Sequence, residues 1–351
     1  MAKVAIITDL HWGVRNNSPF FLQKQKDFYY NQFFPYLEQN NIKNVWIFGD
    51  VLENRKQINV QILNEVNNFF NFLQASEIDT VCLVGNHDTY FKNTNSVNSL
   101  VPITQAFEKI KLIETFDVLE FDGLSVGFIS WISPEIRDQA INWLKTVNAQ
   151  VICGHFEINS FEIVKGVVCS KGLEPSLFER FDKVLSGHFH IRATNGIIQY
   201  IGNPIQTNWG EYGFPKGFGV FDTASKNIQF IDNKDTIYEI VKYNDSIDIG
   251  NFDFSIYSNK IVRILINEYT NKKKLDALLE GIINVAYNIE LIEDKEIIVD
   301  SNNENDIPTD TIHLISQFLD SCKIDHLNRS NLDQIIIEIY KDALERSLIE
   351  C

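Results

Sequence analysis

Five short apolar runs in this chain each end in a turn that carries side chains of the metal-ligand type. The five turns are Asp9-Leu10-His11, Gly49-Asp50, Gly85-Asn86-His87-Asp88, Gly154-His155 and Gly187-His188-Phe189-His190. Apolar runs of this length between turn residues predict buried strands. Sheet folds place their sites at strand ends. One such motif alone would indicate only a strand followed by a polar turn, but five in one chain predict a shared metal site.

The length and composition of the chain fit a folded α/β protein. Its 351 residues suffice for one large domain and a smaller one, and 44% of them are hydrophobic. No apolar stretch approaches membrane-spanning length, and the first run meets Asp9 too early for a signal peptide. The five cysteines are scattered without paired spacing, which favours a reducing compartment. From the apolar pattern and the early Asp9 we expect no association with a membrane.

The chain is strongly acidic, with a net charge of -16. This charge argues against a broad basic surface for nucleic acid. It does not exclude an enzyme that acts on nucleic acid, because bound divalent cations can dominate the local field of a site. Acidic residues are concentrated between Glu290 and Asp310, where Lys295 is the only base. The Asn-rich stretch inside this region predicts a solvated linker.

The order of the predicted elements indicates a large N-terminal domain over residues 1–233. Apolar runs alternate there with helical stretches, as at 57–76 and 136–147, which predicts a layered α/β domain. Later in this domain, residues 197–201, 217–222 and 227–231 have the pattern of successive strands. We expect these hairpins to build the second sheet.

The rest of the chain predicts three further parts. Residues 234–298 form a small α/β cap, with strands at 260–267 and 288–292 around a helix at 272–286. Residues 299–308 are the acidic linker. Residues 309–351 contain two amphipathic helical segments, 311–321 and 330–349, each with an apolar stripe.

The ligand types indicate which metals the site would hold. Two divalent metals need about four ligands each, and one carboxylate can bridge them. A mixed oxygen and imidazole set suits Mn, Fe or Zn better than Ca or Mg, and no cysteine stands at a ligand position, which argues against structural zinc. We expect two divalent ions, Mn first, with Fe, Zn or Mg as alternatives. The candidate ligands are Asp9, His11, Asp50, Asn86, His155, His188 and His190.

His87 directly follows Asn86 and cannot easily point in the same direction. It is therefore predicted to be catalytic, by stabilising the transition state or protonating the leaving oxygen. The alternative is a hydrogen-bonding role inside the turn. Asp88 is predicted to orient His87 or His11.

Taken in this order, the five motifs resemble the calcineurin-like metallophosphoesterase superfamily. The resemblance covers residues 9 to 190 and implies a sandwich of two β-sheets flanked by helices. It implies that Asp50 is shared by two metal ions. One ion would be held by Asp9, His11, Asp50 and His190, and the other by Asp50, Asn86, His155 and His188.

A narrower resemblance is to nuclease subunits of double-strand-break repair complexes, of the SbcD type and of T-even-like bacteriophages. It is carried by the segments 9–13, 154–157, 172–175 and 200–204, which read Asp-Leu-His-Trp-Gly, Gly-His-Phe-Glu, Gly-Leu-Glu-Pro and Tyr-Ile-Gly-Asn-Pro. Glu53 stands where such nucleases often carry Asp, and we expect it to support the metal ligands from behind.

This resemblance implies a DNA exonuclease and single-strand endonuclease that acts in recombination and repair. Its partners would be DNA and an SbcC-type coiled-coil ATPase of the SMC kind, gripped by the C-terminal helices, with a homodimer inside a heterotetramer. The expected location is the cytoplasm of a bacterium or of a phage-infected host.

Several cations and rings near the motifs are candidates for contact with the substrate. Arg15, Arg55 and Lys56 follow ligand motifs and could meet backbone phosphates, although ordinary solvated charges would have the same pattern. The segment 90–92, Tyr-Phe-Lys, could stack on a base or pack on the adjacent sheet.

Two other functions remain open at this point. A protein phosphatase or a cyclic-nucleotide phosphodiesterase would use the same motifs but needs no cap followed by C-terminal helices. A non-catalytic binding scaffold would have lost ligands, and here none is missing.

Overall fold

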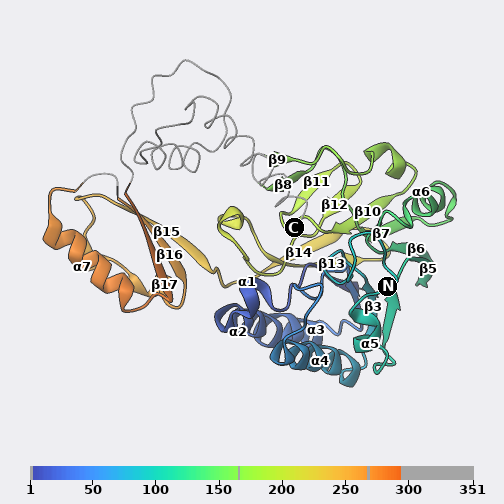
Figure 1. Ribbon diagram of the computed structural model, residues 1–351, viewed down its shortest axis with the longest axis horizontal. Helices are drawn as coiled ribbons and strands as arrows, with labels where there is room; N and C mark the ends of the chain where they lie inside the picture. Colours follow the sequence, from blue (N-terminus) through green and yellow to red (C-terminus); the bar gives the residue numbers. More distant parts are fainter. Residues whose placement is uncertain (1–2, 165–166, 267–268, 294–351) are drawn as a thin grey trace, which may run out of the picture. The chain divides into compact units, whose positions relative to one another are not determined.

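The computed structural model describes residues 3–164, 167–266 and 269–293 (Figure 1). The predicted acidic linker, 299–308, and the predicted C-terminal helices, within 309–351, lie outside the described residues.

The first of two six-stranded sheets contains the first three ligand-bearing strands. Its order is β14 (Ile228–Asp232), β13 (Gly217–Asp222), β1 (Lys3–Ile7), β2 (Asn44–Ile47), β3 (Asp79–Leu83) and β4 (Ile110–Ile113). Strands β1 to β4 are parallel, whereas β13 pairs antiparallel with both β1 and β14.

The second sheet contains the other two ligand-bearing strands. Its order is β11 (Ala193–Asn195), β12 (Ile198–Tyr200), β10 (Lys183–Gly187), β7 (Val151–His155), β6 (Leu124–Ile129) and β5 (Phe116–Phe121). Strands β6, β7, β10 and β12 run parallel, and β11 and β5 close the two edges antiparallel.

Alternation along the strands creates three apolar layers. Val4 and Ile6 of β1 pack in the layer between the two sheets, with Trp46 of β2, Phe128 of β6 and residues of β7 and β10. The intervening residues of β1 and β2 face a second layer, beneath the helices of the first sheet. A third layer lies between the second sheet and α6 (Arg137–Thr146). Strands buried on both faces need apolar residues at every position, which explains the continuous runs in the sequence.

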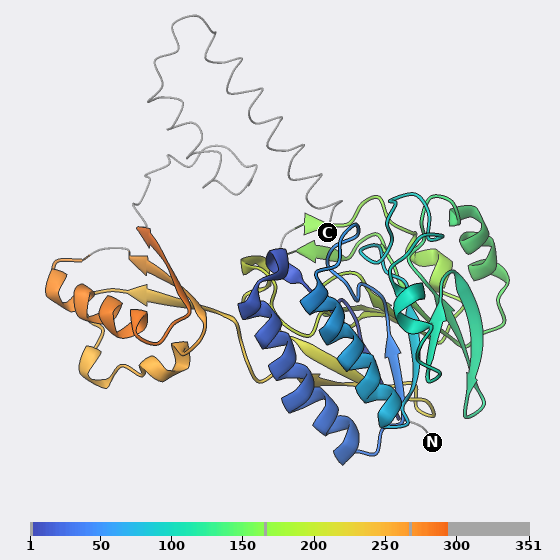
Figure 2. The same ribbon diagram turned by 60° about the horizontal axis from the view of Figure 1, so that its bottom comes forward.

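Helices cover the outer face of each sheet. α2 and α4 lie side by side across the first sheet, coloured dark and lighter blue in Figure 2, and the Lys26 ammonium of α2 lies 2.9 Å from the Glu65 carboxylate of α4. The Asn59 side chain caps α4 by accepting a hydrogen bond from the backbone N–H of Gln61. The helices of this domain are α1 (Val14–Asn17), α2 (Pro19–Phe28), the π-helix Tyr29–Phe33, α3 (Phe34–Gln39), α4 (Val60–Ala75), α5 (Leu100–Thr104), α6, and the 3-10 turns Pro175–Phe178 and Trp209–Glu211.

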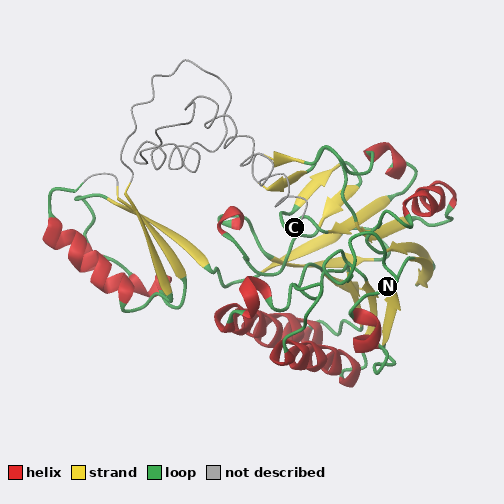
Figure 3. Ribbon diagram, in the orientation of Figure 1, coloured by secondary structure: helices red, strands yellow, loops and turns green. Residues whose placement is uncertain are grey.

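The cap is a parallel three-stranded sheet with one helix along it (Figure 3). Its strands are β15 (Tyr238–Tyr243), β16 (Ile261–Ile266) and β17 (Asn288–Glu293), its helix is α7 (Lys272–Ile283), and 3-10 turns lie at Ile249–Asn251 and Phe254–Tyr257. Val262 and Ile264 of β16 pack with Leu275 and Leu278 of α7 in the core of the cap. A two-stranded ribbon, β8 (Glu162–Val164) and β9 (Val167–Val168), projects from the large domain.

The predicted fold class is confirmed, but the placement of one hairpin was wrong. Residues 217–222 and 227–231 were expected in the second sheet. They form β13 and β14, which extend the first sheet at the free edge of β1. The reason is that β13 is apolar on both faces, with Phe218 in the layer below the helices and Phe221 between the sheets. Only a strand that is covered on both sides buries both faces. Among the described residues, no helix is long and apolar enough to cross a membrane.

Candidate metal centre

The seven candidate ligands meet where the ligand-bearing strands of the two sheets end. Strands β1, β2 and β3 of the first sheet and β7 and β10 of the second lead into the turns that carry them. Five of these side chains are almost completely buried, while His188 and His190 are partly exposed. The five are Asp9, His11, Asp50, Asn86 and His155.

The local backbone explains why glycines stand in the motifs. A Cβ atom on Gly85 would overlap Asp50, and one on Gly187 would overlap Thr8, so only glycine lets these turns approach each other. The backbones of Asp9, His11, Asp50 and His188 have positive φ angles of 53°, 46°, 50° and 84°. Non-glycine residues avoid this conformation, and where they adopt it together they usually hold a functional site.

The first group of donor atoms comprises Asp9, His11 and His190. The Nε2 atoms of His11 and His190 are 3.1 Å apart, and each lies 4.0 Å from Oδ1 of Asp9. Ligand atoms this close can surround one metal ion.

The second group comprises Asn86, His155 and His188. Oδ1 of Asn86 lies 2.8 Å from Nε2 of His155 and 3.0 Å from Nδ1 of His188, and the two nitrogens are 3.1 Å apart. Asp50, His155 and His188 also cluster closely enough to hold an ion.

Asp50 lies between the two groups. Its Oδ2 is 3.7 Å from Nε2 of His11 in the first group and 3.4 Å from Nε2 of His155 in the second. Its Oδ1 accepts a hydrogen bond of 2.8 Å from the backbone N–H of His87, which fixes the carboxylate plane. One oxygen is thus directed to both groups, which is the geometry that a bridging ligand requires.

Each of the four histidines directs one ring nitrogen inward, toward the other candidate ligands, and the other ring nitrogen outward. The partners of the outward nitrogens leave the inward ones suited to a cation. The other ring nitrogen faces a backbone carbonyl or a carboxylate: Phe48 for His155 at 2.7 Å, Glu211 for His190 at 2.8 Å, Glu53 for His11 at 2.7 Å and Glu157 for His188 at 3.4 Å. A proton on the outward nitrogen leaves a lone pair on the inward one, which is the arrangement found around protein-bound metals. Two buried carboxylates among such lone pairs need a cation for compensation. The donor set therefore fits two divalent ions.

The electrostatics of the protein groups alone confirm this need for positive charge. Burial would lower the pKa of His11, but the carboxylates of Glu53, Asp50 and Asp9 outweigh burial and raise it to about 10. Burial would also lower the pKa of His155, but the carboxylates of Asp50 and Asp9 outweigh burial and raise this pKa to about 9. In both cases the surrounding carboxylates attract a cation into the centre, whether a proton or a metal.

His87 lies beside the ligands. Its Nδ1 donates to the backbone carbonyl of Glu53 at 2.7 Å, and its ring centroid is 4.9 Å from that of His11. Its Nε2 is buried and has no hydrogen-bond partner among the described residues. Burial lowers the pKa of His87, with Asp50 opposing the shift. A buried imidazole nitrogen without a partner is available to a substrate atom.

Glu53 and Asp88 support the centre in different ways. Glu53 holds His11 through its carboxylate and His87 through its carbonyl. Asp88 is fully buried, and its carboxylate accepts hydrogen bonds from the backbone N–H groups of Leu52 and Gly85. Asp88 therefore fixes the two loops that carry Asp50 and Asn86. These hydrogen bonds are to backbone groups, whereas the sequence predicted that Asp88 would orient the imidazole of His87 or His11.

Glu211 is a supporting residue that sequence reasoning missed. Its buried carboxylate accepts a hydrogen bond from Nδ1 of His190 at 2.8 Å and lies 2.9 Å from the Lys216 ammonium. Thr207 also donates to it from its backbone and its hydroxyl. Burial would raise the pKa of Glu211, but Lys216 and His190 outweigh it and hold the pKa far below its usual range. Because Glu211 follows no strand, its sequence position carries no signal of this role.

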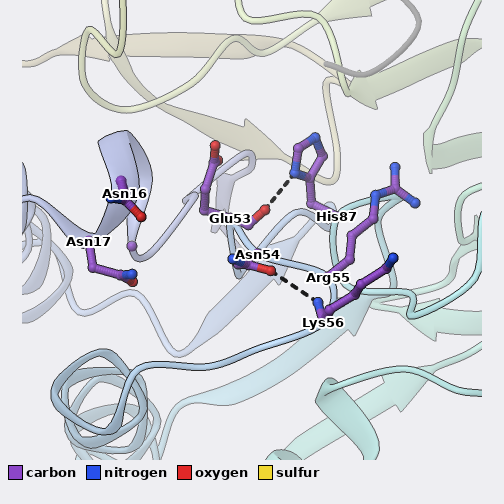
Figure 4. A pocket seen from close by; sticks show the side chains of 8 residues that line it. Asn16, Asn17, Glu53, Asn54, Arg55, Lys56 and His87 are labelled. Carbon is purple, nitrogen blue, oxygen red and sulfur yellow. Dashed lines mark hydrogen bonds between the residues drawn. The ribbon is translucent and has the colours of Figure 1, made fainter.

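The predicted substrate contacts occupy three kinds of position. Arg55 and Lys56 line a cavity of about 360 Å³ beside Glu53 and His87 (Figure 4). Arg15 donates from Nε to the carbonyl of Thr207 at 2.7 Å, which ties it to the loop of Glu211. In the segment 90–92, the rings of Tyr90 and Phe91 contact each other and are 42% and 47% exposed, so they are not packed in a core.

Comparison with known proteins decides the family. Residues 2–192 match the model of the calcineurin-like phosphoesterases. The chain belongs to this family. It is also 26% identical, over 98% of its length and 100% of the relative, to a protein of Enterobacteria phage T4 named exonuclease subunit 1. The family match and the metal-binding clusters together identify a metal-dependent phosphoesterase.

Solved structures with lower similarity include two enzymes that act on phosphate esters. An archaeal phosphodiesterase is 15% identical, with 66% of this chain and 99% of that chain covered and a TM-score of 0.33. A dimetal phosphatase from Danio rerio is 10% identical, with 62% and 91% covered and a TM-score of 0.38. At these TM-scores the two structures add nothing about the substrate.

Replacing Asp50 tests the shared carboxylate. Asp50→Ala should lose both metal ions, because Oδ2 faces both donor groups, and turnover should be lost with them. Metal content after dialysis, measured by mass spectrometry, checks this, with Asp138→Ala on the exposed side of α6 as the control. Two ions retained by the Asp50 variant would contradict the bridging assignment.

Replacing Glu211 tests the support of His190. Glu211→Gln should weaken Mn binding about 10- to 100-fold, the usual effect of losing a carboxylate behind a histidine ligand. Titration calorimetry measures this, with Glu179→Gln on the surface as the matched control. The double variant Glu211→Gln, Lys216→Met removes the buried ion pair as a whole and separates a folding defect from a binding defect. Unchanged Mn affinity in a folded variant would show that Glu211 only stabilises its loop.

Proposed function

We propose that this phosphoesterase is a DNA nuclease that hydrolyses phosphodiester bonds at a two-metal site. The observation that carries the proposal is Asp50, whose Oδ2 faces both donor groups, in a chain with end-to-end similarity to a protein named exonuclease subunit 1. In-line displacement at a phosphodiester uses two neighbouring ions that share a ligand.

The residues divide the chemistry between them. Asp9, His11, Asp50 and His190 would hold one ion, and Asp50, Asn86, His155 and His188 the other. Two bound divalent ions neutralise the phosphate charge and lower the pKa of a water molecule. The set contains only two carboxylates, and the neutral oxygen of Asn86 keeps the loaded centre positive enough to attract an anion. Mn is our first choice, because the mixed oxygen and imidazole ligands suit it.

His87 is the proposed general acid. When its imidazole is protonated, Nε2 carries a proton that no described residue accepts, so this proton can pass to the leaving oxygen. The carbonyl of Glu53 fixes the ring through Nδ1 and directs Nε2 away from it.

The cavity of Figure 4 supports a polymeric anionic substrate. It opens beside His87, and its walls carry Arg55, Lys56 and the amides of Asn16, Asn17 and Asn54. Cations and amides are the groups that bind DNA phosphates and position the strand. A DNA strand that spans the metal centre would place a second phosphate there, whereas a small phosphomonoester would leave this cavity unused.

DNA cleavage is the direct test of this proposal. With Mn, the full chain should degrade labelled duplex ends and nick single-stranded DNA, with little activity on a phosphopeptide or a chromogenic phosphomonoester. Chelation with EDTA is the control and should abolish cleavage. Robust phosphopeptide hydrolysis, without nicking of DNA under any divalent metal, would replace this proposal with that of a protein phosphatase.

Replacing His87 tests the assignment of the acid. His87→Ala should retain both ions and lower turnover about 100- to 10,000-fold, the range expected for loss of a general acid. Metal content and turnover on a labelled single strand are measured for the same sample. Cleavage at the parent rate would reduce His87 to a structural role.

We further propose that the C-terminal segment docks an SbcC-type ATPase, in a heterotetramer built on a homodimer. The relative in phage T4 is named a subunit, and the sequence of 309–351 predicts two helices with apolar stripes. A chain ending at Asn305 should therefore keep metal-dependent cleavage of single strands and fail to co-purify with the ATPase encoded beside it. Binding of that ATPase at full strength by the shortened chain would place the docking site elsewhere.

A further inference from the structure

A second cavity borders the other side of the metal centre. It has a volume of about 230 Å³, and His155, Phe156 and Glu157 form the wall next to the ligands. Trp131, Arg137 and Leu173 are among the residues that line the rest. The cavity of Figure 4 touches the centre through His87 and Glu53, so the two cavities adjoin different parts of it.

The two cavities differ in chemistry. The one beside His87 is lined by amides and cations around Glu53. The one beside His155 is lined by the indole of Trp131 and by aliphatic side chains, with the charged groups of Lys92, Arg137 and Glu157 at its wall. Aromatic surface combined with a cation is what a nucleotide requires, since its base stacks on a ring and its phosphate pairs with the charge.

The backbone of Trp131 is fixed beside the loop that carries Asn86. Its backbone N–H donates to the carbonyl of Val84 at 2.8 Å, directly before the turn that carries Asn86. Its own carbonyl accepts from the side chain of Asn95 at 2.8 Å. Trp131 is partly exposed and lines the cavity, and no ring contact is found for it among the described residues. An aromatic residue on a fixed backbone beside the centre offers a surface on which a base can stack.

The opposite wall is equally fixed. Oε1 of Glu157 lies 3.4 Å from Nε2 of His188, and the backbone carbonyl of Glu157 accepts from the N–H of Leu173 at 2.7 Å. A Cβ atom on Gly172 would press against the backbone of Glu157, so a side chain at this position would deform the wall. Glu157 and the metal ligands are thus joined, and the cavity cannot shift independently of the centre.

We propose that this cavity binds the unpaired base of the nucleotide next to the scissile phosphate, with Trp131 as the stacking residue. This inference rests on the proposed function and specifies its substrate as a strand whose terminal base has left the duplex. A base that is still stacked and paired cannot reach an indole on the wall of a cavity, so paired ends must fray before they are cleaved.

Binding of a nucleotide with and without its base tests the proposal. The ligands are dAMP and deoxyribose 5-phosphate, titrated into the Mn-loaded full chain by calorimetry. Stacking on an aromatic side chain corresponds to about 5- to 150-fold in affinity, so dAMP should bind more tightly by this factor. Trp131→Ala should remove the difference, and Trp131→Phe should restore most of it. Tyr269→Ala, which removes an exposed ring on the cap, should leave it unchanged.

The possible outcomes separate this inference from the proposed function. Equal affinities for the two ligands in the parent chain, or an undiminished preference for dAMP in Trp131→Ala, would overturn the base site while DNA cleavage could still proceed. A parent chain that prefers dAMP but cleaves no DNA would sustain a nucleotide site and overturn the nuclease. The Phe variant keeps the test valid if the Ala variant does not fold.

Discussion

The position of one carboxylate oxygen determines how the rest of this structure is built. Oδ2 of Asp50 lies within 3.7 Å of nitrogen ligands from both donor groups, and this requires the ends of both sheets to converge on one point. Convergence places charged and polar groups in a buried volume, where each needs a partner. The left-handed backbone of Asp9, His11 and His188 and the close approaches at Gly85 and Gly187 follow from this crowding.

A ring of supporting contacts keeps the ligands in place. Glu211 holds His190, Glu53 holds His11 and the carbonyl of Phe48 holds His155. Phe48 and Glu53 come from the loop after β2 and Glu211 from the 3-10 turn Trp209–Glu211, so the centre is bound to the fold on two sides. Rigid support of this kind keeps the ligand side chains in position between the two cavities that border the centre.

The sequence predicted most of the candidate site because its members follow strands. Apolar runs buried on both faces are easily recognised, and a polar turn after each indicated the ligands. Glu211 escaped because it lies in a 3-10 turn and acts through His190. Trp131, the proposed stacking residue, escaped because its place is set by the hydrogen bond of its backbone N–H to Val84, a contact between distant segments. The hairpin of β13 and β14 was misplaced because local alternation does not specify which sheet edge is free.

Anomalous diffraction from crystals of the full chain soaked in Mn tests the central claim most directly. The account predicts two strong peaks about 3.5–4 Å apart, one on each side of Oδ2 of Asp50. One peak should be bounded by His11 and His190 and the other by His155 and His188. A single peak, or a second peak remote from Asp50, would contradict the two-metal centre.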